Sequence, residues 1–257
     1  MFKKSTIHRI ASLFLTLLMV WSCQKDQTEP TPRMIGKVII KIEHYVGNQP
    51  LKLGDTRYQN ALNQPFNVEK FNYYLSNFRL RNLSTGLSFS ENESFHLLRV
   101  DEKSHVLSFE IDSLPLGTFS EFEFAIGIDN AHNTSIDRDG DLDPTNNMAW
   151  DWNTGYKFIV LEGQHFTNTS EGEPLIFHIG EDKNYKTLKY RLSTTQELRS
   201  EAEKTRIITL KCQVEEMFTT PTDIDFKNIS KVSGGQPASD VATNYAQGSL
   251  FQIKSIE

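Results

Sequence analysis

Runs of residues in which every second side chain is apolar recur along this chain, and they constrain its fold more than any other feature. One run places Val38, Ile40, Ile42 and His44 on the same side. The same spacing returns at residues 71–75, 107–111, 122–128, 156–160, 188–192 and 208–214. Successive side chains of a strand point to opposite faces of its sheet, so a period of two predicts strands with one buried face.

The order of these runs predicts an all-β fold. Many strands are expected, without a regular alternation of strand and helix, and the only segment of helical composition is the short stretch from Gln196 to Lys204. Such strands pair mainly antiparallel and bury their apolar faces between two sheets. We therefore expect a single domain over residues 34–257, an antiparallel, immunoglobulin-like β-sandwich without an internal repeat.

The first 33 residues predict an export signal and a tether. A positively charged segment, residues 3–9, precedes an apolar stretch, residues 10–21, that is too short for a relaxed membrane span and is typical of a signal peptide. This stretch ends in Val20-Trp21-Ser22-Cys23, which resembles the bacterial lipobox, where the cysteine becomes diacylated. An ordinary cleaved signal that leaves Cys23 in a flexible linker is the alternative. We expect a signal peptide at 1–22, a polar tether at 23–33 and a membrane anchor on Cys23.

The residues after this cysteine indicate a location. Cys23-Gln24-Lys25-Asp26 resembles the signal that sends lipoproteins of Bacteroidota to the outer face of the outer membrane. The expected location is therefore the outer membrane, with the domain exposed at the cell surface.

Charge and motifs exclude several functions. The chain carries 27 Lys and Arg against 33 Asp and Glu, a net charge of −6, whereas a general nucleic-acid binder needs a basic face. There is no glycine-rich phosphate loop, no G-x-S-x-G and no H-E-x-x-H sequence. Glu121 and Glu123 alternate with core residues and are expected on the solvent face, and Cys212 is expected in the core. We expect a binding protein that is not an enzyme and does not bind nucleic acid.

Four aspartates alternate around a glycine in one short segment. Asp137, Asp139, Asp141 and Asp143 flank Gly140, and such carboxylates can converge on a hard cation such as calcium. The glycine is misplaced for an EF-hand, and Met148 stands where the bidentate glutamate would be needed. A solvated acidic turn is the alternative to a calcium site.

A second segment combines a thioether with indoles. Met148, Trp150 and Trp152 fall on the same side of an extended chain, either as an aromatic core layer or as part of a soft-metal site that suits copper. Three histidines, His44, His96 and His178, alternate with apolar residues of their strands. A buried imidazole is unfavourable unless something satisfies both ring nitrogens, so these three are candidate ligands or hydrogen-bonded core residues.

Several blocks, taken together, resemble the MbnP-like copper-binding proteins in the lipoprotein form found in Bacteroidota. In chain order they are residues 44–47 with 50–54, 71–80, 95–98, 124–129 with Asn133, 142–144, 148–156, 177–180, and 244–246 with Phe251. The most specific combination is Met-x-Trp-x-Trp-x-x-Gly-Tyr at 148–156 followed by Phe-His-Ile-Gly at 177–180.

This resemblance implies a β-sandwich that binds one copper ion outside the inner membrane, for copper acquisition or handling. Carried onto this chain, the first ligand candidates are His44 and His178, with His96 third and Met148 as a soft ligand or neighbour. In the characterised branch of the family a di-haem cytochrome c peroxidase oxidises a tryptophan near the copper to kynurenine, which here would be Trp150 or Trp152. Residues 234–244 contain no His or Met, so any ligand that other members place there is absent.

Two alternatives stand beside copper binding. A surface module for glycans or peptides would use Trp150, Trp152 and Tyr156 as an exposed platform, with His44 and His178 far apart and calcium holding the Asp137 loop. An enzyme would need an open metal position with a bound water and a neighbouring base, for which the sequence offers no motif.

Overall fold

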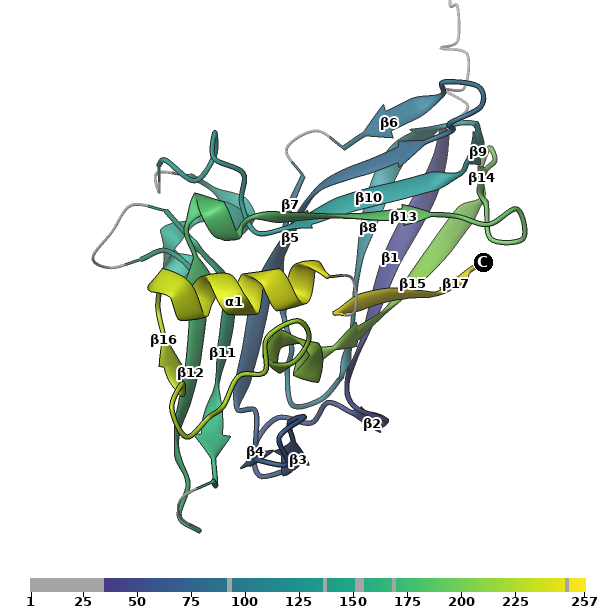
Figure 1. The fold of residues 1–257 in the computed structure, drawn as a ribbon. Helices are drawn as coiled ribbons and strands as arrows, with labels where there is room; N and C mark the ends of the chain where they lie inside the picture. The colour runs from purple at the N-terminus through teal and green to yellow at the C-terminus, as the bar shows by residue number, and fades with distance from the viewer. Residues whose placement is uncertain (1–34, 92–93, 136–137, 151–154, 168–169, 248–249) are drawn as a thin grey trace, which may run out of the picture. The chain divides into compact units, whose positions relative to one another are not determined.

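The computed structural model describes residues 35–91, 94–135, 138–150, 155–167, 170–247 and 250–257, which fold into two large sheets and a small one (Figure 1). The sequence predictions that concern Cys23, Asp137 and Trp152 lie outside these residues. Among the described helices, none has the length and apolarity that are needed to cross a lipid bilayer.

The first large sheet is built around β1 (Ile35–Val46). This strand pairs in parallel with β15 (Thr205–Gln213) and antiparallel with β8 (Val106–Pro115). Strand β17 (Phe251–Ile256) borders β15, and the short β2 (Gln49–Pro50) folds back onto the end of β1. The alternation predicted for β1 is confirmed, because Val38, Ile40 and Ile42 are buried while the residues between them face outward.

The second large sheet is built around β5 (Lys70–Arg81). Its other strands are β3 (Tyr58–Gln59), β4 (Pro65–Phe66), β6 (Ser88–Ser90), β7 (Phe95–Arg99), β10 (Glu121–Ile126), β11 (Lys157–His165), β12 (Glu173–Gly180), β13 (Lys186–Arg191) and β16 (Lys231–Val232). A separate two-stranded sheet joins β9 (Gly117–Phe119) to β14 (Leu198–Ser200).

One edge of β5 carries two strands in succession. Tyr73 pairs with β11 on one side and with β7 on the other, and Leu75 pairs with β10 on one side and again with β7 on the other. Strands β10 and β11 therefore follow each other along the same edge of β5. The segment that connects them begins at Gly127, where β10 ends, and it carries Trp150 of the candidate site.

Two hydrophobic clusters cover opposite faces of this second sheet. The main core lies between the two large sheets and contains the inward side chains of β1, β5, β10, β12 and β15. The second cluster lies on the outer face and consists of Tyr74, Ile128, Leu142, Met148, Ala149, Tyr156, Phe158 and Val160. Because described residues between β10 and β11 contribute to this second cluster on the outer face, neighbouring side chains of β5 such as Tyr73 and Tyr74 are both buried.

The predicted all-β sandwich is confirmed, with two local differences. Two strand pairs, β1–β15 and β12–β16, are parallel, although all other named pairs are antiparallel. The expected helical stretch from Gln196 to Lys204 contains β14 instead, because Leu198 is fully buried opposite Phe119.

A helix occurs where none was predicted. Helix α1 (Gly235–Ala246) packs on β12 and on the 3₁₀ helix η4 (Val214–Phe218), and Figure 1 shows it lying across β11 and β12. Its buried stripe consists of Ala238, Val241, Ala242 and Tyr245. These positions have the i, i+3, i+4, i+7 spacing of an amphipathic helix. The spacing is present in the sequence, but two small alanines make the apolar signal weak.

Candidate functional site

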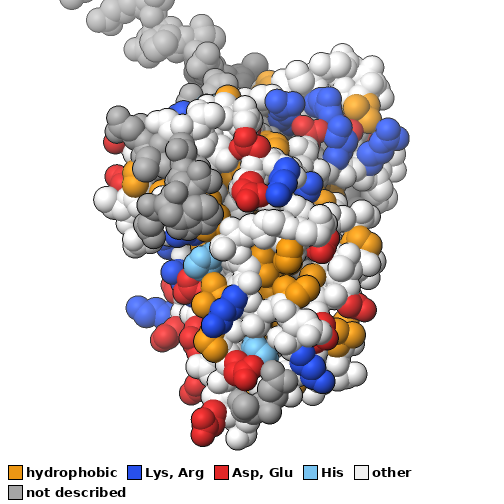
Figure 2. Space-filling model, turned by 60° about the vertical axis from the view of Figure 1, so that its left-hand side comes forward, with side chains coloured by type: hydrophobic (Ala, Val, Ile, Leu, Met, Phe, Trp, Pro, Cys, Tyr) orange, Lys and Arg blue, Asp and Glu red, His pale blue; other side chains and the backbone are white. Residues whose placement is uncertain are grey.

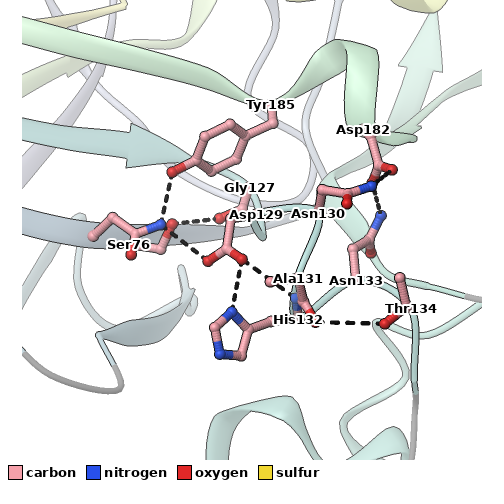
Figure 3. Close-up of polar contacts among 11 residues, drawn as sticks. Ser76, Gly127, Asp129, Asn130, Ala131, His132, Asn133, Thr134, Asp182 and Tyr185 are labelled. Carbon is pink, nitrogen blue, oxygen red and sulfur yellow. Dashed lines mark hydrogen bonds and ion pairs between the residues drawn. The ribbon is translucent and has the colours of Figure 1, made fainter.

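The segment between β10 and β11 is tied to β5 where it leaves the sheet. The backbone N–H of Gly127 donates to the carbonyl of Tyr74 at 3.0 Å, and the hydroxyl of Ser76 donates to the carbonyl of Gly127 at 2.7 Å (Figure 3). Gly127 has φ +104°, and a Cβ there would come within 2.5 Å of the Phe158 ring. Only glycine therefore fits this exit from the sheet.

Asp129 holds the beginning of this segment through both carboxylate oxygens. His132 Nδ1 lies 2.7 Å from Oδ1, and Asn77 Nδ2 lies 3.1 Å from Oδ2 and 2.7 Å from the Tyr185 hydroxyl (Figure 3). Burial acts to raise the pKa of Asp129, but the hydrogen bonds from His132 and Asn77 outweigh it and lower that pKa below its ordinary value. Asp129 is therefore ionised at neutral pH and fixes the imidazole of His132.

Asn133 joins three parts of the chain. Its Oδ1 accepts a hydrogen bond from the backbone N–H of Tyr156 at 2.8 Å, and its Nδ2 donates to Asp182 Oδ1 at 2.7 Å. Asp182 begins the 3₁₀ helix η3 (Asp182–Asn184) directly after β12, and Asn130 also contacts its carboxylate (Figure 3). One amide side chain thus positions the loop against the start of β11 and the end of β12.

Trp150 lies over the end of β12. An isolated bridge pairs Ala149 with Tyr156, and the backbone N–H of Trp150 donates to the Gly155 carbonyl at 3.0 Å. A Cβ at Gly180 would come within 2.9 Å of the Trp150 indole, so the ring rests directly on this glycine. Trp150 is only 6% exposed.

His178 lies beside this indole. The two ring centroids are 6.4 Å apart, and His178 Nε2 is 2.7 Å from Glu162 Oε1 on the neighbouring strand β11. The Glu162 carboxylate accepts this hydrogen bond, so Nε2 is the donor, and no hydrogen bond from a described residue reaches Nδ1. The side chain of His178 is 23% exposed. An imidazole that is oriented by a carboxylate through one nitrogen and has its other nitrogen without a protein partner is the usual arrangement of a histidine that binds metal.

Acidic side chains lie close to this histidine. Glu162 also lines a hollow of about 390 Å³ whose wall includes Glu69 and Glu171. On the face shown in Figure 2, histidine side chains have acidic side chains beside them. Such carboxylates favour the approach of a cation.

His44 lies in the main core and not beside His178. It is fully buried, with Nδ1 2.7 Å from the His105 carbonyl and Nε2 2.7 Å from the Tyr73 hydroxyl. The carbonyl can only accept, so Nδ1 donates to it and Nε2 accepts the tyrosine proton. Burial lowers the pKa of His44 to about 4, so the ring is neutral at pH 7.

The structure does not bring the three predicted histidines together. His178 pairs with Val160 of the second cluster, whereas its neighbours Phe177 and Ile179 belong to the main core, so the sheet separates His178 from His44. His96 lies elsewhere, 3.0 Å from Glu91 Oε2 and stacked at 3.9 Å on Phe109. Within the described ranges, no three His, Cys, Asp or Glu side chains converge as metal ligands.

Met148 belongs to the second cluster, where it is almost completely buried. Its carbonyl accepts a hydrogen bond from the backbone N–H of Lys157 at 2.6 Å. Lys157 Nζ also lies 5.5 Å from the centre of the Trp150 ring. Met148 thus packs in the second cluster, two residues before Trp150.

In the acidic segment around Gly140, the carboxylates of Asp141 and Asp143 accept hydrogen bonds from the backbone. Asp141 Oδ2 accepts from Leu97 N–H at 2.8 Å, while Asp143 Oδ1 accepts from the backbone and hydroxyl of Thr145 at 2.8 and 2.6 Å. Asp143 is therefore the N-cap of the 3₁₀ helix η2 (Pro144–Asn146), and the hydrogen bonds from Thr145 lower its pKa. Asp139 precedes the 3₁₀ helix η1 (Gly140–Leu142). These contacts fit an ordered turn, without a convergence of its described carboxylates on one point.

The aromatic platform is not exposed at its described positions. Tyr156 is fully buried and donates to the Leu142 carbonyl at 2.6 Å, and Trp150 is almost fully buried. His132, Glu162 and Asp182 were not among the site residues predicted from the sequence. Their roles depend on strand register and on the path of residues 127–156, for which no short sequence pattern exists.

Comparison with known proteins identifies the family. A search of curated proteins finds no match. Among solved structures, MbnP from Methylosinus trichosporium has the same fold with a TM-score of 0.50 and 12% identity, over 78% of this chain and 81% of that chain. The family model named MbnP matches residues 35–235, from the first residue of β1 to the first residue of α1. Since this match covers most of the chain, the protein belongs to the MbnP family.

Proposed function

We propose that this protein is an exported lipoprotein that binds one copper ion on the outer face of the second sheet, with His178 as the principal ligand. Its role is binding, for copper acquisition or handling. Membership of the MbnP family and the earlier resemblance to copper-binding members support this choice of metal. The observation that carries the choice of site is the His178 imidazole, which is fixed by Glu162 and lies beside Trp150.

The chemistry of these residues fits copper. Neutral imidazole binds copper in both of its common oxidation states, and a thioether such as that of Met148 suits Cu(I). Glu162 would orient the ring and increase its basicity. His44 is a poorer candidate, because both of its nitrogens already have partners in the core.

Trp150 is the residue that we propose for oxidation. It lies next to His178, so a copper ion on that imidazole would have this indole as a neighbour. In this proposal a di-haem cytochrome c peroxidase uses two equivalents of hydrogen peroxide to cleave the C2–C3 bond of the indole and releases two waters, and hydrolysis of the resulting N-formyl group releases formate and leaves kynurenine. Mass spectrometry of the peptide that contains Trp150, from protein made in its native host, tests this step.

Copper titration of the purified full chain tests the site. We expect one equivalent to bind tightly, a His178→Ala variant to lose this binding, and a Glu162→Gln variant to bind about tenfold more weakly. His96→Ala is the matched control, since it removes a carboxylate-paired histidine at a different place and should bind as the wild type does. Equal affinities of the His178 and His96 variants would refute the assignment.

A further inference from the structure

Strands β2, β3 and β4 lie at the same end of the domain (Figure 1), and a second concave site is lined by residues of and near these strands. It is a cleft of about 830 Å³, bounded by residues 46–49 after β1, by residues 57–61 around β3, and by the beginning of η4. This volume is within the range of sites for small ligands. The MbnP copper proposal does not involve any of these residues.

Internal hydrogen bonds hold the walls of this cleft in place. Glu215 Oε1 accepts from Gly47 N–H at 2.5 Å and so joins η4 to the turn after β1. Asn60 Oδ1 accepts from Gln64 N–H at 2.9 Å, and the Tyr58 hydroxyl accepts from Lys52 N–H at 2.7 Å. A cleft that is formed before binding avoids the entropic cost of ordering its walls around a ligand.

Two opposite charges line this cleft without neutralising each other. Glu216 is partly buried, and no hydrogen bond or ion pair reaches its carboxylate from the described residues. Arg57 is an exposed residue that lines the same cleft and forms no ion pair with any described residue, while its guanidinium lies 3.7 Å from the centre of the Phe166 ring.

A partly buried carboxylate without a partner is unfavourable in the free protein. Burial raises the pKa of Glu216, which is the sign of that cost. The neighbouring carboxyl of Glu215 faces the same cleft, and Lys211 is the cation that acts on Glu215 from β15. A ligand cation at Glu216 would offset this cost, and a ligand anion would form an ion pair with the Arg57 guanidinium.

We propose that this cleft binds a zwitterion, an α-amino acid or a short peptide with free ends. The ligand ammonium would pair with Glu216 and the ligand carboxylate with Arg57. The side-chain amides of Asn48 and Gln59, which also line the cleft, suit the peptide groups between these two ends.

Calorimetric titration of the full chain with model peptides tests this proposal. Triglycine should bind, whereas N-acetyl-triglycine and triglycine amide, which each lack one terminal charge, should bind about tenfold more weakly. Glycine as a fourth ligand shows whether a single amino acid can span the two charges or whether a peptide is needed.

Two variants assign the ends of the ligand. Glu216→Gln should weaken the binding of triglycine by about tenfold and leave the binding of N-acetyl-triglycine unchanged, because that peptide lacks the ammonium. Arg57→Gln should weaken the binding of triglycine by about tenfold and leave the binding of triglycine amide unchanged, because that peptide lacks the carboxylate. Glu102→Gln, in an exposed turn, is the control for charge alone. Equal affinity of the wild-type chain for all three peptides, or no heat with triglycine, overturns the proposal. Copper titration of the same variants should be unchanged, so the two sites are tested separately.

Discussion

His44 shows how a titratable ring can be part of a core. Each of its ring nitrogens has a partner at 2.7 Å, the His105 carbonyl on one side and the Tyr73 hydroxyl on the other. No polar atom of the ring is therefore left unsatisfied, which is the condition for burying it. The same burial disfavours the charged ring and lowers its pKa to about 4.

This depressed pKa makes His44 a source of acid sensitivity. Between pH 6.5 and about 4 the unfolded chain binds a proton at this residue and the folded chain does not, so stability falls as the pH falls. The free energy of unfolding should decrease by about 1.4 kcal/mol per pH unit in this window from His44 alone. The amide of a His44→Gln variant does not titrate. In denaturant unfolding between pH 6.5 and about 4, the free energy of unfolding of this variant should therefore change less steeply with pH than that of the wild type, by the amount that corresponds to one proton. An unchanged slope would mean that folded His44 takes up the proton.

Glu121 and Glu123 show what alternation predicts about a residue. It placed both on the side of β10 that faces away from the core, and the structure agrees, since Phe122 and Phe124 are in the core. It also predicted solvated carboxylates, and this was wrong: Glu121 is 4% exposed and Glu123 is 7% exposed. Arginine and lysine side chains of the neighbouring strands cover them, with Arg81 2.5 Å from Glu121 and Lys189 3.1 Å from Glu123. Burial of this kind depends on cross-strand neighbours, which a single strand does not reveal.

At the scale of elements, the strands could be predicted from the sequence, but the segments that cover each face of a sheet could not. Period two predicted β1, β5, β8, β10, β11, β13 and β15, because alternation is a property of each strand alone. It could not show that residues between β10 and β11, among them Ile128, Leu142 and Met148, lie over the outer face of the second sheet and form a second cluster there. For that reason the apolar neighbours of His178 and His44 suggested one shared core, although a sheet separates the two rings. Residues Met148 and Trp150 were found as a segment, but their position against β12 needed the tertiary fold.

Asn133 is the residue on which the position of this covering segment depends. An Asn133→Ala variant removes the acceptor of the Tyr156 N–H and the donor to Asp182, and it leaves a buried backbone donor unpaired. We expect a loss of about 1–3 kcal/mol in the free energy of unfolding and faster amide hydrogen exchange at Tyr156. The neighbouring Thr134→Ala is the control, because Thr134 is exposed and its hydroxyl makes only a 3.4 Å contact. Comparable losses in both variants would show that the bonds of Asn133 do not hold the segment.

At the scale of the molecule, the sandwich separates the two proposed sites. The copper proposal uses the outer face of β11 and β12, whereas the zwitterion cleft lies beyond the last residue of β1. The sequence enters the described domain at Ile35, the other end of β1, and twelve residues at about 3.3 Å each make this strand about 40 Å long. The cleft is therefore at the end of the domain opposite to the residue where the predicted tether joins it.

The tether itself leads to the last prediction, which concerns Cys23. If Cys23 is diacylated, two acyl chains at about 0.8 kcal/mol per buried CH₂ hold the protein firmly at the membrane. A Cys23→Ser variant should lose labelling by radioactive palmitate and move from the membrane fraction to the soluble fraction. Its domain should fold as before, because the only cysteine among the described residues, Cys212, is fully buried in β15. Cys212→Ala is the matched control and should keep both the label and the membrane location. Palmitate labelling that survives in Cys23→Ser would place the lipid on another residue. If neither the wild type nor the Cys23→Ser variant is labelled, the segment is an ordinary cleaved signal.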